Sequence, residues 1–362
     1  MSTGGNRATD IFGPCGIGQL GLKNRFVRSA TAESAATPDG VLTEAVFPIY
    51  EALARGGVGL IITGHMYVDD GWKCSSLQTG IARKDHLPGL RRLAQACRSN
   101  GAKIVAQINH AARPPEGMSL ADSRRATDCF VAAAGRAQEA GFDGVQIHAA
   151  HGFLLSGFLT PAVNRRADAY GGDAAGRRRL LVETAAGMRR SLGPQYPILC
   201  KLGVVDGYDD CLALEESVAT AQALEEAGVD AVEVSCTRSG DHAQAVAMGI
   251  DAPEKEAYFA PQAKVIKQSV GIPVLLVGGL RSRIVMQNVI DEGVCDMISM
   301  SRPFIREPDL INRMEARRVD GSSCISCGEC FRKPSLHCSH VPTSGRRRWW
   351  PAWKSSARSD KV

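Results

Sequence analysis

The sequence predicts a (β/α)8 barrel, or TIM barrel, built as a single domain with a short cysteine-containing C-terminal extension. Short apolar, β-branched runs alternate with amphipathic helical patterns along most of the 362 residues. Eight such runs occur, and their nearly continuous apolar character is typical of parallel strands buried on both faces. Eight strand–helix units favour a closed barrel over an open sheet. No GxGxxG follows an early strand, which counts against a dinucleotide-binding fold.

The expected elements can be placed from these patterns. Strands are expected at 25–30, 58–64, 102–108, 144–149, 198–203, 231–236, 274–279 and 297–301. Helices are expected at 43–55, 85–99, 122–140, 174–191, 213–227, 256–269, 282–292 and 307–317, the first opening at Thr43. Three helices end in related phrases, EAGFDGV, EAGVDAV and EGVCDMI. In each, a glycine ends the helix and an aspartate occupies the turn before the next strand.

Composition and charge indicate an ordinary soluble globular protein, with 44% hydrophobic and 22% charged residues. Residues 343–362 carry six Lys or Arg and one Asp, which accounts for the whole net charge of +5. The remainder is neutral, so no nucleic-acid groove is expected in the fold. No apolar run approaches the length of about 18 residues that a membrane span needs. The N-terminus lacks the apolar core of a secretory signal, so a cytoplasmic location is expected.

We expect the barrel to occupy residues 1–318. A cysteine-rich extension would follow at 319–340, and a basic tail at 341–362. Tails of this composition are commonly disordered.

Polar residues gather where the expected strands end, which is the face on which barrel enzymes carry their sites. Gln107 ends the third strand and Lys201 the fifth. An amide that donates and accepts suits the pyrimidine edge of a flavin. A fixed cation would stabilise the negative charge of the reduced ring. Each residue alone is equally compatible with a solvated barrel rim.

Strands seven and eight lead into GGLRS (278–282) and SRPFIREP (301–308). Glycine lets backbone N–H groups approach a ligand, a helix N-terminus favours an anion, and Arg302 can supply a counter-charge. A phosphate site after these strands is frequent in the fold. A simple tight turn is the alternative.

Two histidines, His148 and His151, follow strand four in the phrase HAAH. Spaced three residues apart on a turn, the two rings can converge on one anionic atom of a small-molecule substrate. A metal site and purely structural histidines are the alternatives, although no third ligand lies nearby in the sequence.

At this point the chain resembles the old yellow enzyme family of NAD(P)H:flavin oxidoreductases, which are FMN-containing barrels. The resemblance covers roughly 11–332 and lies nearest the branch of bacterial 2,4-dienoyl-CoA reductases and NADH oxidases. The matching phrases include LKNRFVRSATAES (22–34), GGVGLIITGHMYV (56–68), AQINHAAR (106–113) and MSRPFIREPDLINR (300–313). The long segment at 140–172 is the most specific.

The resemblance implies a binding site for FMN and a mechanism. It assigns FMN contacts to Ser29, Ala30, Thr31, Gly64, Gln107, Lys201, Gly278, Gly279, Ser301 and Arg302. His148 and His151 would hold the carbonyl oxygen of the substrate. Hydride would pass from NAD(P)H through FMN to an activated alkene, of the enone or enoyl type, or to another acceptor. Relatives often self-associate, so a homo-oligomer is compatible with the resemblance.

Two departures keep other interpretations open. The family usually has a tyrosine as proton donor two residues after the second histidine, where this chain has Phe153. Tyr67 or water would have to supply the proton instead. The loop after strand three is also shorter than in relatives. A degraded flavin-binding barrel with little or no turnover is therefore an alternative. A flavin-free barrel enzyme acting on a phosphorylated metabolite is another.

Four cysteines near the C-terminus, Cys324, Cys327, Cys330 and Cys338, read C-x2-C-x2-C-x7-C. Four thiolates at such spacing suit an iron–sulfur cluster or tetrahedral zinc. Multidomain relatives bind a [4Fe–4S] cluster here with wider spacing and continue into an FAD domain, whereas 24 residues follow Cys338. A vestigial motif is the third interpretation.

Overall fold

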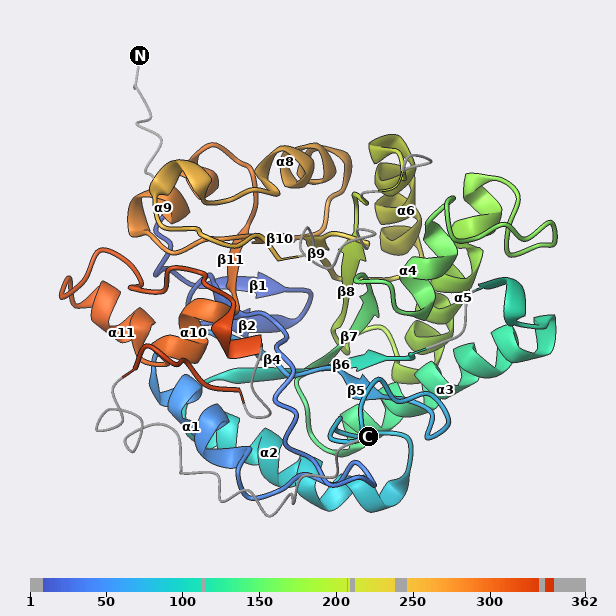
Figure 1. The fold of residues 1–362 in the computed structure, drawn as a ribbon, viewed down its shortest axis with the longest axis horizontal. Coiled ribbons are helices and arrows are strands. Elements are labelled where there is room, and N and C mark those ends of the chain that lie inside the picture. The colour runs from blue at the N-terminus through green and yellow to red at the C-terminus, as the bar shows by residue number, and fades with distance from the viewer. Residues whose placement is uncertain are drawn as a thin grey trace.

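The predicted closed parallel barrel is confirmed. The structure is a computed structural model that describes residues 9–111, 115–206, 208, 212–237, 246–331 and 336–341. Eight parallel strands follow one another in the order β3, β4, β6, β7, β8, β9, β10 and β11, and β11 pairs with β3 to close the ring (Figure 1). A short strand, β5 (Met66–Tyr67), adds a further pairing to β6.

All eight expected strand–helix units are present. The strands are β3 (Phe26–Arg28), β4 (Leu60–Ile62), β6 (Lys103–Asn109), β7 (Gly144–Ala149), β8 (Ile198–Gly203), β9 (Ala231–Ser235), β10 (Val274–Val277) and β11 (Met297–Met300). The helices are α1 (Phe47–Arg55), α2 (Leu87–Ser99), α3 (Leu120–Glu139), α5 (Ala174–Leu192), α6 (Leu214–Glu226), α8 (Ala260–Ser269), α9 (Arg283–Asp291) and α11 (Leu310–Glu315). The predicted start at Thr43 is wrong, because its hydroxyl donates to the Ala35 carbonyl and the helix begins at Phe47.

The three repeated turn phrases share one hydrogen-bonding device. Each glycine, at 141, 228 and 293, has a positive φ that ends its helix. Each aspartate then makes two hydrogen bonds to one residue near the start of the preceding strand. Its carboxylate accepts from the backbone N–H of that residue, and its own backbone N–H donates to the carbonyl of the same residue. The carboxylate accepts from a backbone N–H in the pairs Asp143–Ile104, Asp230–Ile198 and Asp296–Val274, at 2.9, 2.7 and 2.8 Å. These contacts fix neighbouring strands in register at the amino end of the barrel.

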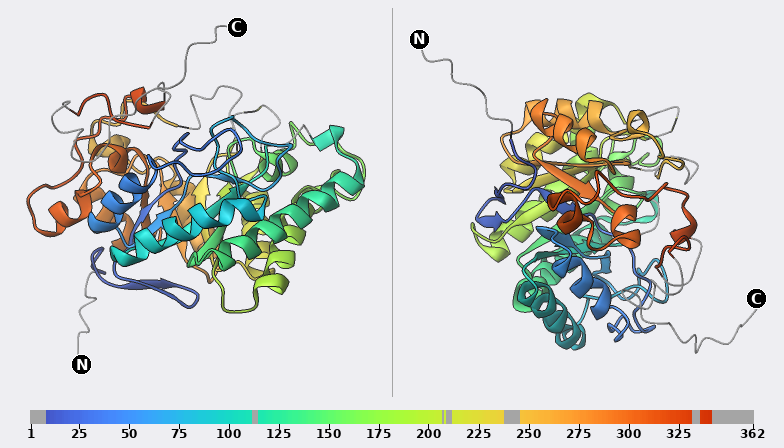
Figure 2. Two further views of the ribbon diagram at one scale, coloured as in Figure 1. Left: turned by 90° about the horizontal axis from the view of Figure 1, so that it is seen from below. Right: turned by 90° about the vertical axis from the view of Figure 1, so that its left-hand side faces the viewer.

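A hairpin that the sequence did not predict closes the amino end of the barrel. It is formed by β1 (Cys15–Ile17) and β2 (Leu20–Leu22) and lies at the opposite end from the cysteine-rich extension (Figure 2). Ile17, Leu20 and Leu22 pack against inward-facing strand residues such as Leu60 and Leu199. The amino half of the barrel is therefore dry and apolar.

The inward-facing side chains change character toward the carboxyl ends of the strands. Because side chains alternate along a strand, residues two positions apart face the same way. Val27, Val105, Leu199, Ala231 and Met297 belong to the apolar layer above the hairpin. Two residues further on, the same strands carry Ser29, Gln107, Lys201, Glu233 and Ser299, all buried. A polar layer thus lies between the apolar plug and the carboxyl-end face.

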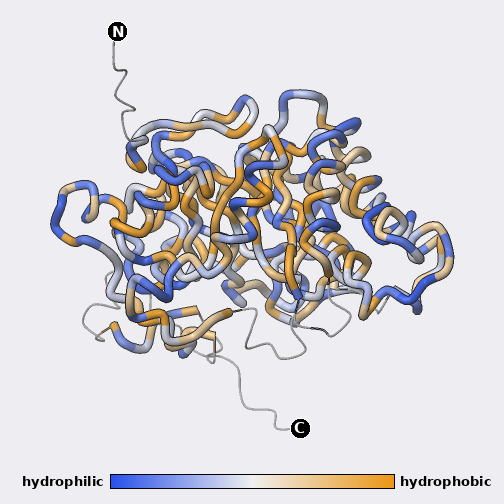
Figure 3. Tube along the Cα trace, turned by 90° about the horizontal axis from the view of Figure 1, so that it is seen from above, coloured by the Kyte–Doolittle hydropathy of each residue, from blue (hydrophilic) through white to orange (hydrophobic). Residues whose placement is uncertain are grey.

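The larger apolar core lies outside the ring, where the helices pack on the strands. Apolar segments are concentrated inside the molecule and polar ones on its surface (Figure 3). Two short helices were not predicted, α4 (Leu154–Leu159) and α10 (Arg302–Arg306), and both follow strands at the carboxyl end. None of the helices in the described ranges has the length and apolar character needed to cross a bilayer.

Removing one turn aspartate should destabilise the barrel. Asp230→Ala leaves the Ile198 N–H without its 2.7 Å acceptor and breaks the 2.6 Å ion pair with Arg189. We expect a loss of about 2–4 kcal/mol in the free energy of unfolding, as for a buried donor left unpaired. Urea denaturation measures the loss. Glu254→Ala, at an exposed position, is the control and should change the value by less than about 0.5 kcal/mol. Equal stability of the two variants would contradict the role of the turn.

Candidate functional site

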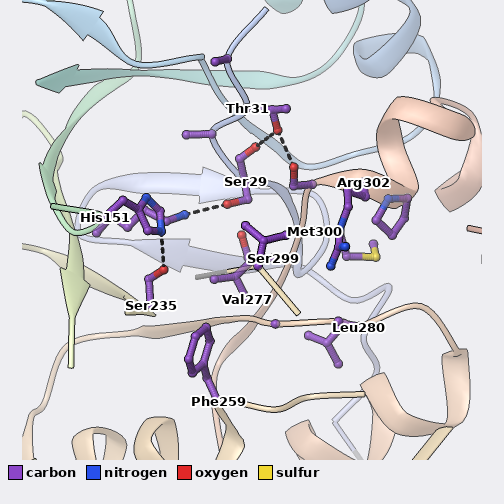
Figure 4. A pocket seen from close by; sticks show the side chains of 18 of the residues that line it. Ser29, Thr31, His151, Ser235, Phe259, Val277, Leu280, Ser299, Met300 and Arg302 are labelled. Atoms are coloured by element: carbon purple, nitrogen blue, oxygen red, sulfur yellow. Dashed lines mark hydrogen bonds between the residues drawn. The ribbon is translucent and has the colours of Figure 1, made fainter. Parts of the chain in front are cut away.

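One cavity opens at the carboxyl ends of the strands, above the polar layer. It collects residues from β3, β7, β8, β9, β10 and β11 and their following turns, with several of them shown in Figure 4. Of the predicted site residues, the cavity is lined by Ser29, Ala30, Thr31, His148, His151, Lys201, Gly278, Gly279, Ser301 and Arg302. Three predicted residues, Tyr67, Gly64 and Gln107, are not among the residues that line it.

The end of the cavity near β10 and α10 has the features expected of a phosphate site. Gly278 and Gly279 both have positive φ, of 138° and 75°, which side chains other than glycine rarely adopt. Arg302 lies at the start of α10 and is mostly buried. It donates to the carbonyl of Ser326 at 3.1 Å, which holds the guanidinium beside the cavity. The turn therefore offers backbone N–H groups and a cation to an anion.

The inner wall of the cavity is a hydrogen-bonded polar surface. The Lys201 ammonium group donates to Ser29 Oγ at 2.8 Å and pairs with the Glu233 carboxylate at 2.9 Å. Thr31 Oγ1 bonds the Ser29 carbonyl at 2.9 Å and Ser301 Oγ at 2.8 Å (Figure 4). One network therefore joins the strand ends of β3, β8, β9 and β11.

Gln107 and Gly64 make separate hydrogen bonds within the protein. The Gln107 amide is buried, donates to Gln146 Oε1 at 2.7 Å, and leaves its own Oε1 without a partner among the described residues. An unpaired buried acceptor fits an N–H donor from a ligand such as the flavin pyrimidine ring. The Gly64 N–H bonds the Tyr50 hydroxyl at 3.1 Å and Glu33 at 3.3 Å. The Gly64 N–H is thus engaged within the protein, and the expected backbone contact of Gly64 with the cofactor stays a prediction.

The predicted histidine pair is brought together. His148 Nε2 and His151 Nδ1 lie 2.9 Å apart, and His151 Nε2 lies 2.8 Å from Ser235 Oγ. Burial, the neighbouring histidine rings and the Lys201 charge hold the pKa of His148 well below its usual value. Burial and Lys201 lower the pKa of His151 to about 3. Both imidazoles are therefore neutral near pH 7.

Tyr67, a predicted catalytic residue, does not line the cavity. Its side chain is fully buried, and its hydroxyl donates to the Asp39 carbonyl at 2.9 Å. Burial and Asp70 raise the pKa of Tyr67. A hydroxyl committed to a loop carbonyl outside the cavity cannot reach a substrate there, so the proposed acid role of Tyr67 is corrected.

The sequence predicts no particular site role for His65, Ser235, Gln146 and Glu233. His65 lines the cavity, with its ring 5.1 Å from Phe153 and 5.8 Å from His148. It directly follows Gly64, for which only a backbone contact is predicted. Gln146 and Glu233 are polar residues within otherwise apolar strands. That contrast, read with the alternation of side chains, is the signal that could have found them.

The four C-terminal cysteines line one small cavity beside Arg302. All four are free thiols, and Arg306 donates to Cys338 Sγ at 3.4 Å. Within the described ranges, no three His, Cys, Asp or Glu side chains are grouped closely enough to hold a metal ion. The arrangement therefore does not itself fit a bound metal, and the [4Fe–4S] assignment stays a prediction. Residues 332–335 and the tail at 342–362 lie outside the described residues.

Fold and cavity together define a (β/α)8-barrel protein with its site at the carboxyl ends of the strands. Comparison with known families gives the particular group: the chain belongs to the NADH:flavin oxidoreductase / NADH oxidase family, whose model matches residues 10–121 and 112–321. The resemblance to old yellow enzymes is thereby confirmed. The structure of the old yellow enzyme homologue from Zymomonas mobilis matches with a TM-score of 0.73 and 25% identity, over 88% of this chain and 95% of that one.

Two longer proteins are also similar. NADH oxidase of Thermoanaerobacter brockii is 31% identical over 98% of this chain and 59% of its own length. A 2-naphthoyl-CoA reductase structure matches with a TM-score of 0.84 and 22% identity, over 94% of this chain and 58% of that one. This chain therefore spans somewhat more than half the length of these two proteins.

The neutral histidines predict how stability depends on pH. The unfolded chain binds protons at His148 and His151 below about pH 6.5, whereas the folded chain, with lowered pKa values, does not. Folding stability should therefore be complete above that pH and fall as pH decreases toward 5. Each buried histidine contributes a slope approaching about 1.4 kcal/mol per pH unit.

Urea unfolding of wild type and His151→Asn between pH 7 and pH 5 measures this slope. The variant should lose part of it. His340→Asn, at an exposed position, is the matched control and should keep the wild-type slope. A slope unchanged in His151→Asn would show that His151 titrates normally in the fold.

Proposed function

We propose that this chain is an FMN-dependent oxidoreductase that takes hydride from NAD(P)H and passes it to an activated alkene or another acceptor. The observation that carries the proposal is the layout of one cavity. A glycine–arginine turn lies at one end, a lysine-centred polar wall along the inside, and a histidine pair beside that wall. Family membership supports the same cofactor and reductant.

The residues divide into groups that would hold different parts of FMN. Gly278, Gly279, Ser301 and Arg302 would bind the phosphate, and Lys201 and Gln107 the pyrimidine edge. When bound, the cofactor supplies the hydride chemistry. The charge on Lys201 would favour negative charge on the adjoining ring, and Gln107 Oε1, which has no partner among the described residues, would accept a hydrogen bond from the ring N–H.

The histidine pair would polarise a carbonyl oxygen. Ser235 can donate its hydroxyl proton to His151 Nε2, which places the His151 proton on Nδ1. In the structure this Nδ1–H donates to His148 Nε2, so a carbonyl oxygen would replace that hydrogen bond. The oxygen would accept from His151 Nδ1–H and, with the other His148 tautomer, from His148 Nε2–H, and neutral donors would stabilise its developing negative charge in a water-poor site.

Anaerobic reduction tests the proposal. Addition of NADH or NADPH to FMN-loaded protein should bleach the flavin absorbance, and a conjugated enone should restore it. His148→Ala should slow the restoring step by about 100-fold or more, as when an oxyanion donor is removed, while bleaching persists. Loaded protein that neither coenzyme bleaches would instead favour the second candidate, a flavin-binding barrel without turnover, which the absence of a tyrosine at Phe153 motivates.

Restoring a phenol at position 153 should accelerate alkene reduction. The Phe153 ring lines the cavity and lies 4.6 Å from the His148 ring, so a hydroxyl on this ring would face the same space. General acids contribute about 10²–10⁴-fold, and we expect Phe153→Tyr to raise kcat for enones within that range. Phe153→Leu is the control without a proton donor. An equal rate in both variants would mean that protonation does not limit turnover.

A further inference from the structure

The Glu233 carboxylate is the most connected polar group beneath the cavity, and nothing in the proposed mechanism uses it. Its side chain is completely buried. Oε1 accepts hydrogen bonds from Ser29 Oγ and Ser299 Oγ, both at 2.7 Å, and pairs with Lys201 at 2.9 Å. Oε2 accepts from Gln146 Nε2 at 2.9 Å. Four other strands of the barrel therefore converge on one carboxylate.

The carboxylate is ionised. Burial disfavours the charged form of Glu233, but Lys201 and the two serine hydroxyls outweigh it and hold the pKa below its usual value. An ionised carboxylate can only accept hydrogen bonds. Every group that touches Glu233 must therefore present a proton to it.

This requirement sets the orientation of two amides in turn. Gln146 must point its NH₂ group at Glu233, so its Oε1 faces Gln107. Gln107 must then point its own NH₂ group at Gln146, which leaves Gln107 Oε1 unpaired. Without the Glu233 anion, both amides could flip together and keep the hydrogen bond between them.

We propose that Glu233 is the positioning residue of the flavin site, acting through two partners. Through Gln146 it presents Gln107 as an acceptor toward the imide N–H of the pyrimidine ring. Through its ion pair it offsets part of the Lys201 charge and so holds the reduction potential of bound FMN below the value that an unpaired lysine would give. The inference rests on the proposed binding of FMN at this cavity.

Two variants separate these effects. Glu233→Gln removes the negative charge, and with it the acceptor that fixes the orientation of the Gln146 and Gln107 amides. FMN should therefore bind at least about 10-fold more weakly. The reduction potential of the bound flavin should also become more positive, because the unpaired Lys201 charge stabilises the reduced form. Gln146→Met is the matched control: it breaks the link to Gln107 but leaves the ion pair, so affinity should fall while the potential stays near that of wild type.

The measurements are fluorescence titration of the flavin-free protein with FMN and dye-equilibrated potentiometry of the loaded protein. Glu233→Asp keeps the charge but draws it back from Lys201, so it should shift the potential in the same direction by a smaller amount. If Glu233→Gln does not fold, the Glu233→Asp variant tests whether Glu233 sets the reduction potential. A potential unchanged or more negative in the Glu233 variants, or a shift in Gln146→Met as large as theirs, would overturn the inference. A wild-type protein that binds no FMN would overturn the proposed function itself.

Discussion

A negative charge buried at the centre of the barrel constrains everything around it. A carboxylate without solvent is costly unless it is paired and hydrogen-bonded, and Glu233 is paired and bonded by groups from β3, β7, β8 and β11. Each of those groups is thereby fixed in place and in proton orientation. The residues of the inner wall bond this anion, and a ligand in the cavity would meet the donors and acceptors that remain.

The layers of the barrel make that anion tolerable. The β1–β2 hairpin seals the amino end with apolar side chains, so water cannot enter from below. The polar layer lies two residues further along the strands, where the ammonium group of Lys201 pairs with the Glu233 carboxylate. Above it, the strands end in turns whose glycines and arginine open toward the cavity. A charge network placed one layer lower would have no polar partners, and one placed higher would be screened by water.

The same burial governs the histidines. His65 and His148 lie beside Phe153, and His151 lies beside His148, in a space where charge is disfavoured, so their pKa values are lowered and their neutral forms are favoured. A neutral donor polarises an oxygen without transferring a proton. In the proposed function, the pair would bind an oxygen, and proton delivery to carbon would need another group because position 153 is a phenylalanine.

The sequence by itself determined the barrel and ten of the residues that line the cavity. Alternation of apolar strands with amphipathic helices repeats eight times, and such local patterns survive folding because each unit buries its own apolar face. Residues at strand ends such as Lys201 and Arg302 could be assigned for the same reason: the fold brings all carboxyl ends of the strands to one face.

Tertiary structure alone decided which of the expected groups were already hydrogen-bonded within the protein. The Tyr67 hydroxyl donates to the Asp39 carbonyl, and the Gly64 N–H donates to Tyr50 and Glu33. Glu233 pairs with Lys201 and accepts hydrogen bonds from Ser29 and Ser299 across the ring. Those partners are far away in the chain, and hydrogen bonding between them depends on barrel closure and stagger, which no local pattern encodes.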